Sequence, residues 1–173
     1  FANAAKRILN EGNIGSLSNT ESERAVFVGT LELEGFNRER ITEVRVNQNK
    51  LREYTLKYAG GRCCVTGISD PAFLIASHIK PWSVCEPKER TDPHNALCLN
   101  AFHDKLFDGY RMTVTGDMEI VYDPKLEETI PGRVYRNMIS GYTEIRVNEN
   151  NRPGEKYLAY HNTRFSKITG VKI

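Results

Sequence analysis

The chain has 173 residues, a net charge of +2, 39% hydrophobic residues and 27% charged residues. These values are ordinary for a globular protein, and the longest apolar runs fall far short of the roughly 18 residues that a membrane span requires. No secretory signal is visible, so we expect a cytoplasmic protein with no membrane partner. The length corresponds to one domain with, at most, an appended subdomain.

The first part of the chain predicts a helix, a loop, a strand and a second helix. The helix covers residues 2–10, the loop 13–24 and the strand 24–33. An apolar stripe of Leu51, Tyr54 and Tyr58 then predicts a helix that ends at Gly60-Gly61.

The next segment predicts two strands separated by a loop. Residues 73–79 form a β-type run ended by Pro81, which places His78 at the end of a strand. Residues 83–94 are polar and contain two prolines, which is typical of a loop. Residues 96–99 are short and apolar enough for a second strand.

A helix is predicted over residues 101–108, with Asn100 as its N-cap. At about 100° per residue, one face carries Phe102, His103, Leu106 and Phe107, and the other carries Asp104, Lys105 and Asp108. His103 should therefore point at the strands and not at water.

The rest of the chain predicts a hairpin and a final helix. Residues 111–115 and 118–122 flank Gly116-Asp117 as hairpin strands. His161 lies in a predicted helix, and we expect it to be structural. The fold class is therefore α+β: a ββα core over residues 45–130, an N-terminal extension over 1–44, and a C-terminal hairpin-plus-helix region whose last part, 131–173, packs on the core.

The order of His78, Asn95 and His103 suits phosphodiester cleavage. Such a reaction needs a base for water near neutral pH and a cation on the developing phosphate charge. A histidine suits the first task, and a neutral inward imidazole suits the second. The amide of Asn95 can hold the intervening loop.

Structural readings of the same residues are the ordinary alternative. A lone inward histidine is more often a core residue than a ligand, and Pro93-His94-Asn95 looks like a turn. What favours function is the occurrence of all three residues, in the right elements, within 26 residues.

The segment resembles the HNH (ββα-metal) endonuclease family, in particular its bacterial restriction-type branch. The resemblance rests on Arg45-Val46-Asn47-Gln48, on Cys63-Cys64-Val65-Thr66-Gly67, on Ser77-His78-Ile79-Lys80-Pro81-Trp82 and on the run 93–104. It implies a general base at His78, a loop-ordering amide at Asn95 and a divalent-cation ligand at His103.

Two positions depart from the family pattern. Many relatives have an aspartate as second metal ligand before the catalytic histidine, and here that position is Ser77, a weak ligand. The usual glycine after the asparagine is Ala96. The expected cofactor is Mg²⁺ or Mn²⁺, held by His103 and Ser77.

Cysteine spacing disfavours structural zinc. None of the four cysteines forms a Cys-x-x-Cys pair, and adjacent Cys63 and Cys64 should face opposite sides of a strand. We expect buried thiols without disulfides.

The charge distribution favours a nucleic-acid partner over its alternative, ordinary solvated surface. Residues 38–65 hold seven Lys/Arg against three acids, and residues 151–173 hold five against one. We expect Lys80, Arg90 and Arg62 to contact the phosphates of double-stranded DNA.

The sequence therefore predicts a divalent-metal-dependent DNA endonuclease of a restriction or anti-phage defence system. Alternatives are a nuclease effector domain of a larger regulated defence protein, a non-catalytic DNA-binding module, and a ribonuclease toxin. Because double-strand cutting generally needs two active sites, the mechanism favours a homodimer.

Overall fold

The computed structural model describes residues 48–173, which belong to one compact unit spanning Val44–Ile173. The elements expected over residues 2–33, and the motif residues Arg45, Val46 and Asn47, lie outside the described residues. The described part begins with a helix over residues 48–58 and turns at Gly60 and Gly61, whose φ angles of 61° and 65° suit glycine. Its stripe is only partly apolar: Leu51 is buried, whereas Tyr54 and Tyr58 are exposed.

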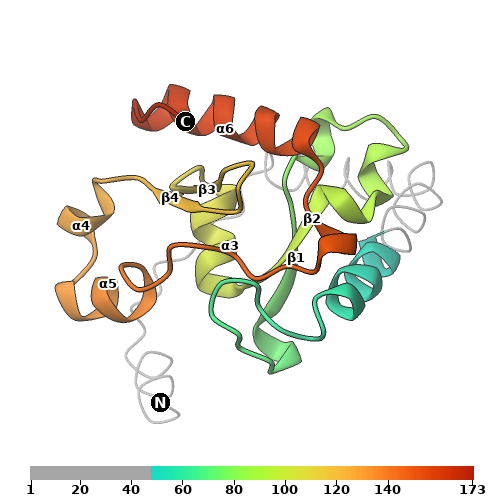
Figure 1. Cartoon of the computed structure of the whole chain (residues 1–173), viewed down its shortest axis with the longest axis horizontal. Helices are drawn as coiled ribbons and strands as arrows, with labels where there is room; N and C mark the ends of the chain where they lie inside the picture. Colours follow the sequence, from blue (N-terminus) through green and yellow to red (C-terminus); the bar gives the residue numbers. More distant parts are fainter. Residues whose placement is uncertain (1–47) are drawn as a thin grey trace, which may run out of the picture. The chain divides into compact units, whose positions relative to one another are not determined.

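The rest of the chain consists of two pairs of small antiparallel strands and of helices (Figure 1). The strands are β1 (Leu74–His78), β2 (Ala96–Asn100), β3 (Met112–Val114) and β4 (Ile120–Tyr122). The helices are α3 (Ala101–Asp108), α4 (Leu126–Thr129), α5 (Gly132–Met138) and α6 (Glu155–Thr169). The expected α+β class is confirmed. The polar loop between β1 and β2 is more ordered than predicted, because it contains three short 3-10 turns.

Strands β1 and β2 form the pair that was expected around the loop. They are antiparallel, with Leu74 opposite Asn100 and His78 opposite Ala96. Beyond the pair, the amide of Ile79 donates to the carbonyl of Asn95 at 3.0 Å. The two ends of the loop are therefore held side by side at the edge of the sheet.

Helix α3 follows β2 without a linker, because Asn100 ends the strand and caps the helix. Its side-chain oxygen accepts from the amides of Phe102 and His103, each at 3.0 Å. The helix contacts both β1 and β2, and it buries His103, Leu106 and Phe107. This completes a ββα unit.

The C-terminal region joins the two sheets. The amide of Cys64 donates to Cys98 of β2, and the amide of Arg146 donates to the carbonyl of Cys64, both at 2.8 Å. The amide of Ile145, the residue before Arg146, donates to the carbonyl of Met118 just before β4. Residues 131–173 are thus built into the same unit as the ββα core.

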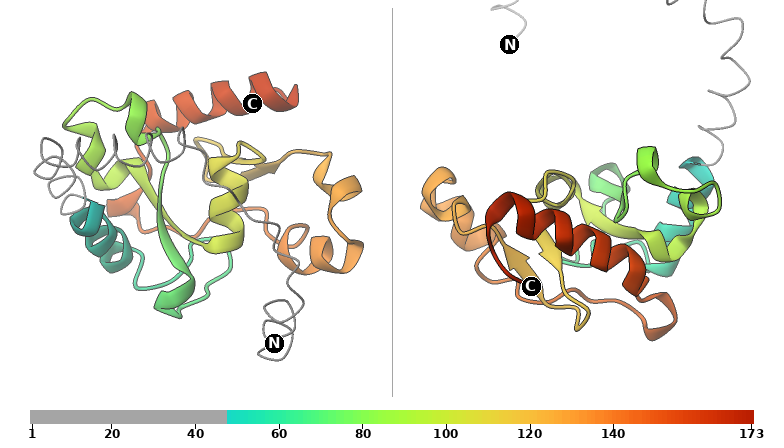
Figure 2. Two further views of the ribbon diagram at one scale, coloured as in Figure 1. Left: turned by 180° about the vertical axis from the view of Figure 1, so that it is seen from behind. Right: turned by 90° about the horizontal axis from the view of Figure 1, so that it is seen from above.

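Helix α6 runs alongside the β3–β4 hairpin and contacts β3 (Figure 2). The largest fully buried apolar side chains of the described residues include Tyr157, Phe107, Phe165, Leu99, Met112 and Ile139. Among the described residues, no helix combines the length and the apolar character that crossing a membrane demands.

His161 of α6 is part of this core. Its ring stacks on Phe107 with centroids 3.9 Å apart, and its Nε2 donates to the carbonyl of Phe107 at 3.1 Å. The hydroxyl of Thr113 lies 2.8 Å from Nδ1 and donates to Oδ1 of Asn162 at 2.6 Å. The expected structural role of His161 agrees with this placement.

Burial lowers the pKa of His161 from 6.5 to about 4, with the Phe107 carbonyl opposing that shift. The unfolded chain therefore binds one more proton than the folded chain between about pH 6.5 and pH 4. The stability that this histidine contributes is complete above pH 6.5 and is lost as the pH falls to about 4, by an amount on the order of 3 kcal/mol. We predict that His161→Phe flattens the dependence of unfolding free energy on pH in this window. Urea unfolding from pH 7 to pH 4 measures it, and a variant with the wild-type slope would contradict the prediction.

Candidate active site

His78 ends β1 with its imidazole held in one tautomer. Its Nε2 lies 3.0 Å from the carbonyl oxygen of Arg90. Because a carbonyl only accepts, Nε2 carries the ring proton, and Nδ1 keeps a free lone pair. Among the described residues, Nδ1 has no hydrogen-bond partner. The ring is therefore arranged to accept a proton at Nδ1.

The surroundings of His78 keep the ring neutral. Burial lowers its pKa from 6.5, and the hydrogen bond to Arg90 raises it in part. The edge of Trp82 packs against the ring with centroids 5.7 Å apart, and the guanidinium of Arg90 lies over Trp82 at 5.2 Å. On the side of the helix over residues 48–58, His78 lines a cleft of about 290 Å³. The other residues that line this cleft are Gln48, Asn49, Leu51, Arg52, Ile75 and Ala76.

Asn95, which is fully buried, ties the loop to the end of β1. Its Oδ1 accepts from the amide of Lys80 at 2.8 Å. Its Nδ2 donates to the carbonyl of Glu89 at 3.0 Å, with the Lys80 carbonyl and the Cys85 sulfur also within reach. Since Glu89 immediately precedes Arg90, this amide supports the carbonyl that holds His78. The structure thus brings Asn95 and His78 together.

The side chain of Ser77 lies on the face of β1 opposite that of His78, because successive side chains of a strand point to opposite faces. It is 4% exposed, and it lies close enough to the carboxylate of Asp104 on α3 to affect the pKa of that group. Burial raises the pKa of Asp104, the nearby Ser77 lowers it in part, and Asp108, one turn later, raises it further. These side chains form a set of oxygen donors on the α3 side of β1, the face opposite His78.

His103 lies inside the protein, as its helix position predicted, but each ring nitrogen faces a protein oxygen. Its Nε2 donates to the carbonyl of Met138 at 2.8 Å, and its Nδ1 lies 3.2 Å from Oδ1 of Asn100. The residue is fully buried, and burial lowers its pKa to about 4. In this arrangement neither nitrogen faces an open coordination position, so the ligand role implied by the resemblance stays a prediction.

The three residues expected to contact phosphates, Lys80, Arg90 and Arg62, have different surroundings in the structure. Lys80 pairs with Glu89, its Nζ lying 2.5 Å from Oε2, and is not a free cation. Arg90 lies over Trp82, and its Nε has no hydrogen-bond partner among the described residues. Arg62 is exposed and reaches only the carbonyl of Gly67, at 3.4 Å. Their roles in DNA binding stay predictions.

All four cysteines are buried free thiols, as expected, but Cys63 and Cys64 lie at a turn and not in the strand that was expected. Cys63 accepts from the amide of Asn100 at 3.2 Å, and burial raises the pKa of the Cys64 thiol. Within residues 48–173, no three histidine, cysteine or acidic side chains gather as a metal cluster.

Two features escaped the sequence reading. Asp104 was assigned to the water-facing side of α3, yet it is half-buried against Ser77. It lies at the edge of the apolar stripe, where the helical period alone does not decide burial. The sequence reading gave Glu89 no role beyond the loop. It pairs with Lys80, nine residues earlier, and that pair can be predicted only once the loop is known to fold back.

Removing the Asn95 amide should loosen the loop. Asn95→Ala leaves the Lys80 amide and the Glu89 carbonyl without partners, which should cost about 1–3 kcal/mol of unfolding free energy. Hydrogen exchange of residues 80–95 should accelerate, while the exposed control Asn148→Ala should not change it. Unchanged exchange in Asn95→Ala would show that the loop is held by other contacts.

Comparison with known proteins finds a family that part of the chain resembles. The sequence pattern of a family described as HNH endonuclease matches residues 63–115. A solved structure described as a modification-dependent TagI restriction endonuclease is 19% identical with a TM-score of 0.44, and the match covers 66% of this chain and 36% of that chain. No curated protein matches. The matched segment contains Ser77, His78, Asn95, His103 and Asp104, so the part of the chain that carries the candidate site is similar to the HNH endonuclease family.

Proposed function

We propose that the protein is a divalent-metal-dependent DNA endonuclease in which His78 is the general base. The observation that carries this proposal is the Nε2 hydrogen bond from His78 to Arg90, which leaves Nδ1 unprotonated. A neutral imidazole with a free lone pair is the group that water activation at a phosphodiester needs. A module that only binds DNA has no use for it.

In this proposal, Nδ1 of His78 takes a proton from the attacking water. The Arg90 carbonyl accepts from Nε2 throughout, so it orients the ring and stabilises the imidazolium that forms. Asn95 acts indirectly, because it holds the Glu89 carbonyl and hence the adjoining peptide. Burial of His78 keeps the ring neutral near pH 7, when the base is needed.

Ser77 and Asp104 fit a hard divalent cation. Mg²⁺ and Mn²⁺ prefer oxygen ligands, and Mg²⁺ is commonly held by one or two carboxylates with water completing its shell. We propose Asp104 as the ligand from α3, with Ser77 beside it and the exposed Asp108 as a second carboxylate. When bound, the cation would neutralise the phosphate and stabilise the departing 3′-oxygen, which leaves a 5′-phosphate. His103 would then serve the fold by bonding Met138.

The contact with DNA is assigned to basic residues that are not paired in the structure. Lys80 is excluded from a direct role as long as it pairs with Glu89, whereas Arg62 and the basic side of α6 are exposed. The α6 segment carries Arg164 and Lys167, followed by Lys172. Binding through such residues should weaken steeply as salt increases.

The resemblance to the restriction-type branch supports a role in restriction or anti-phage defence. An effector domain within a larger regulated protein is the second candidate, and it shares the same chemistry. A double-strand cut would require two copies of the site, which favours a homodimer acting on duplex DNA.

His78→Ala should abolish cleavage and leave DNA binding almost unchanged. Loss of a general base typically lowers a rate by about 10²–10⁴-fold, whereas the proposed phosphate contacts lie elsewhere. Cleavage of supercoiled plasmid, linear duplex and RNA with Mg²⁺ or Mn²⁺ measures the rate, and binding in Ca²⁺ measures affinity. Wild-type cleavage by the variant would remove His78 from the mechanism, and cleavage of RNA alone by the wild type would replace DNA as substrate.

The metal assignment is tested by comparing two neighbouring residues of α3. Asp104→Asn should weaken Mn²⁺ binding in calorimetry. His103→Leu should retain it and lower the unfolding free energy by about 1–3 kcal/mol, because the Met138 carbonyl loses its donor. Asp117→Asn, in the exposed hairpin turn, is the matched control for loss of a carboxylate. If His103→Leu loses Mn²⁺ and Asp104→Asn binds it normally, His103 is the ligand and Asp104 is not.

A further inference from the structure

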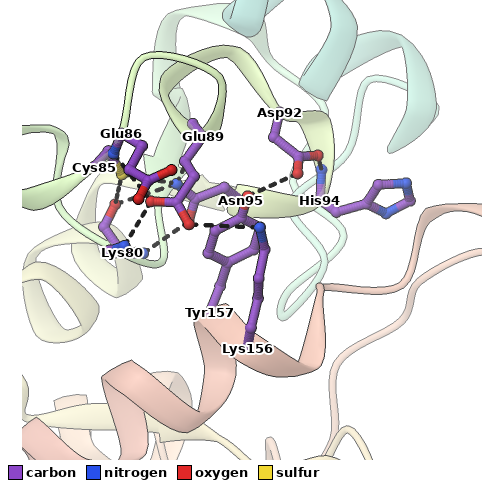
Figure 3. A network of polar contacts seen from close by, with 9 residues as sticks. All are labelled: Lys80, Cys85, Glu86, Glu89, Asp92, His94, Asn95, Lys156 and Tyr157. Atoms are coloured by element: carbon purple, nitrogen blue, oxygen red, sulfur yellow. Dashed lines mark hydrogen bonds and ion pairs between the residues drawn. The ribbon is translucent and has the colours of Figure 1, made fainter.

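The loop between β1 and β2 is held from two sides, and only one of them belongs to the ββα unit. Asn95 holds it from within, as described above. From outside, the start of α6 contacts the same loop through charged, polar and backbone groups (Figure 3). These contacts join residues more than 55 positions apart in the chain.

Glu89 is the first point of contact. Its Oε2 pairs with Lys80 and accepts from the amide of Glu86 at 3.0 Å, while Oε1 lies 3.4 Å from Nζ of Lys156 on α6. These interactions lower the pKa of Glu89, and the Lys80 hydrogen bond contributes most. The carboxylate is therefore ionised at neutral pH and links the strand end, the loop and α6.

Tyr157 provides the second contact, and it is the more buried one. Its side chain is 1% exposed, and its hydroxyl donates to Oδ2 of Asp92 at 2.7 Å. The other oxygen of Asp92 accepts from the amide of His94 at 2.9 Å. The Tyr157 ring thus enters from α6 and holds the part of the loop that follows Arg90.

Backbone contacts just before α6 complete the attachment. The amide of Gly154 donates to the carbonyl of His94, and Nδ1 of His94 donates to the carbonyl of Arg152, both at 2.9 Å. A side chain at residue 154 would meet the Tyr157 ring at 2.9 Å, so glycine is needed for this close approach.

The peptide that holds His78 lies between these contacts. Arg90, whose carbonyl accepts from His78 Nε2, follows Glu89 directly and precedes Asp92 by two residues. With Glu89 held by Lys156 and Asp92 held by Tyr157, the carbonyl between them has little freedom to rotate.

We propose that the first turn of α6 positions the general base, with Tyr157 as a positioning residue that acts through Asp92 and the Arg90 carbonyl on the tautomer of His78. This inference rests on the proposed role of His78 as base. It extends the functional unit beyond residues 63–115, since a ββα segment without α6 would retain His78 and lose the outer support of its partner.

Tyr157→Phe is the sharpest test, because it removes only the hydroxyl and keeps the ring packed against the core. Tyr160→Phe, on the same helix and with no hydrogen bond to the loop among the described residues, is the matched control. Single-turnover cleavage of duplex DNA with Mg²⁺ should fall by about tenfold in Tyr157→Phe, as is typical for residues that orient an active group. The dissociation constant for duplex DNA in Ca²⁺ should stay at the wild-type value, and Tyr160→Phe should match the wild type in both.

A second readout does not depend on activity. The ¹⁵N spectrum of the His78 imidazole in the full chain should show the Nε2–H tautomer in the wild type and in Tyr160→Phe, and a mixture of tautomers in Tyr157→Phe. A wild-type tautomer and a wild-type cleavage rate in Tyr157→Phe would overturn the proposal. If the wild type fails to cut DNA while Tyr157→Phe still alters the tautomer, the coupling holds and the proposed function fails.

Discussion

The side-chain amide of Asn95 is the interaction on which the site depends. It is fully buried, and it accepts from one end of the loop and donates to the other, so that the amide of Lys80 and the carbonyl of Glu89 are held by one planar group. A carboxylate could not replace it, because the Glu89 carbonyl needs a donor. Once these two points are held, the Arg90 carbonyl lies beside β1 and meets the imidazole of His78.

Strand geometry then divides the chemistry between two faces. Ser77 and His78 are consecutive in β1, so their side chains leave the strand on opposite sides. His78 lines the cleft beside the helix over residues 48–58, whereas Ser77 lies next to Asp104 of α3. Ser77 and His78 are therefore held on the two faces of one strand, which is paired to β2 along its whole length. The edge of a small sheet supplies rigidity that a free loop would not provide.

Local patterns predicted most of the catalytic segment. Strand β1, the Asn100 cap, helix α3 and the hairpin were all expected from short-range signals, since propensity, capping and apolar period agree there. The sequence also predicted that His103 points inward. The partner that His103 meets inside the protein is the carbonyl of Met138 in α5. This residue is 35 positions away, so no local pattern reveals the contact. The same limit applies to Asp104, which lies at the boundary of the helix face, and to the pairing of Lys80 with Glu89, which depends on the path of the loop.

The central claim is that His78 is the base and that a cation is held by Asp104 and Ser77. The most direct measurement is anomalous diffraction from Mn²⁺ in a crystal of His78→Ala bound to duplex DNA, since this variant should hold substrate without cutting it. The account predicts a Mn²⁺ peak about 2.1 Å from a carboxylate oxygen of Asp104, next to the scissile phosphate, with His103 still bonded to Met138. A peak on a ring nitrogen of His103, with Asp104 turned away from the phosphate, would contradict it.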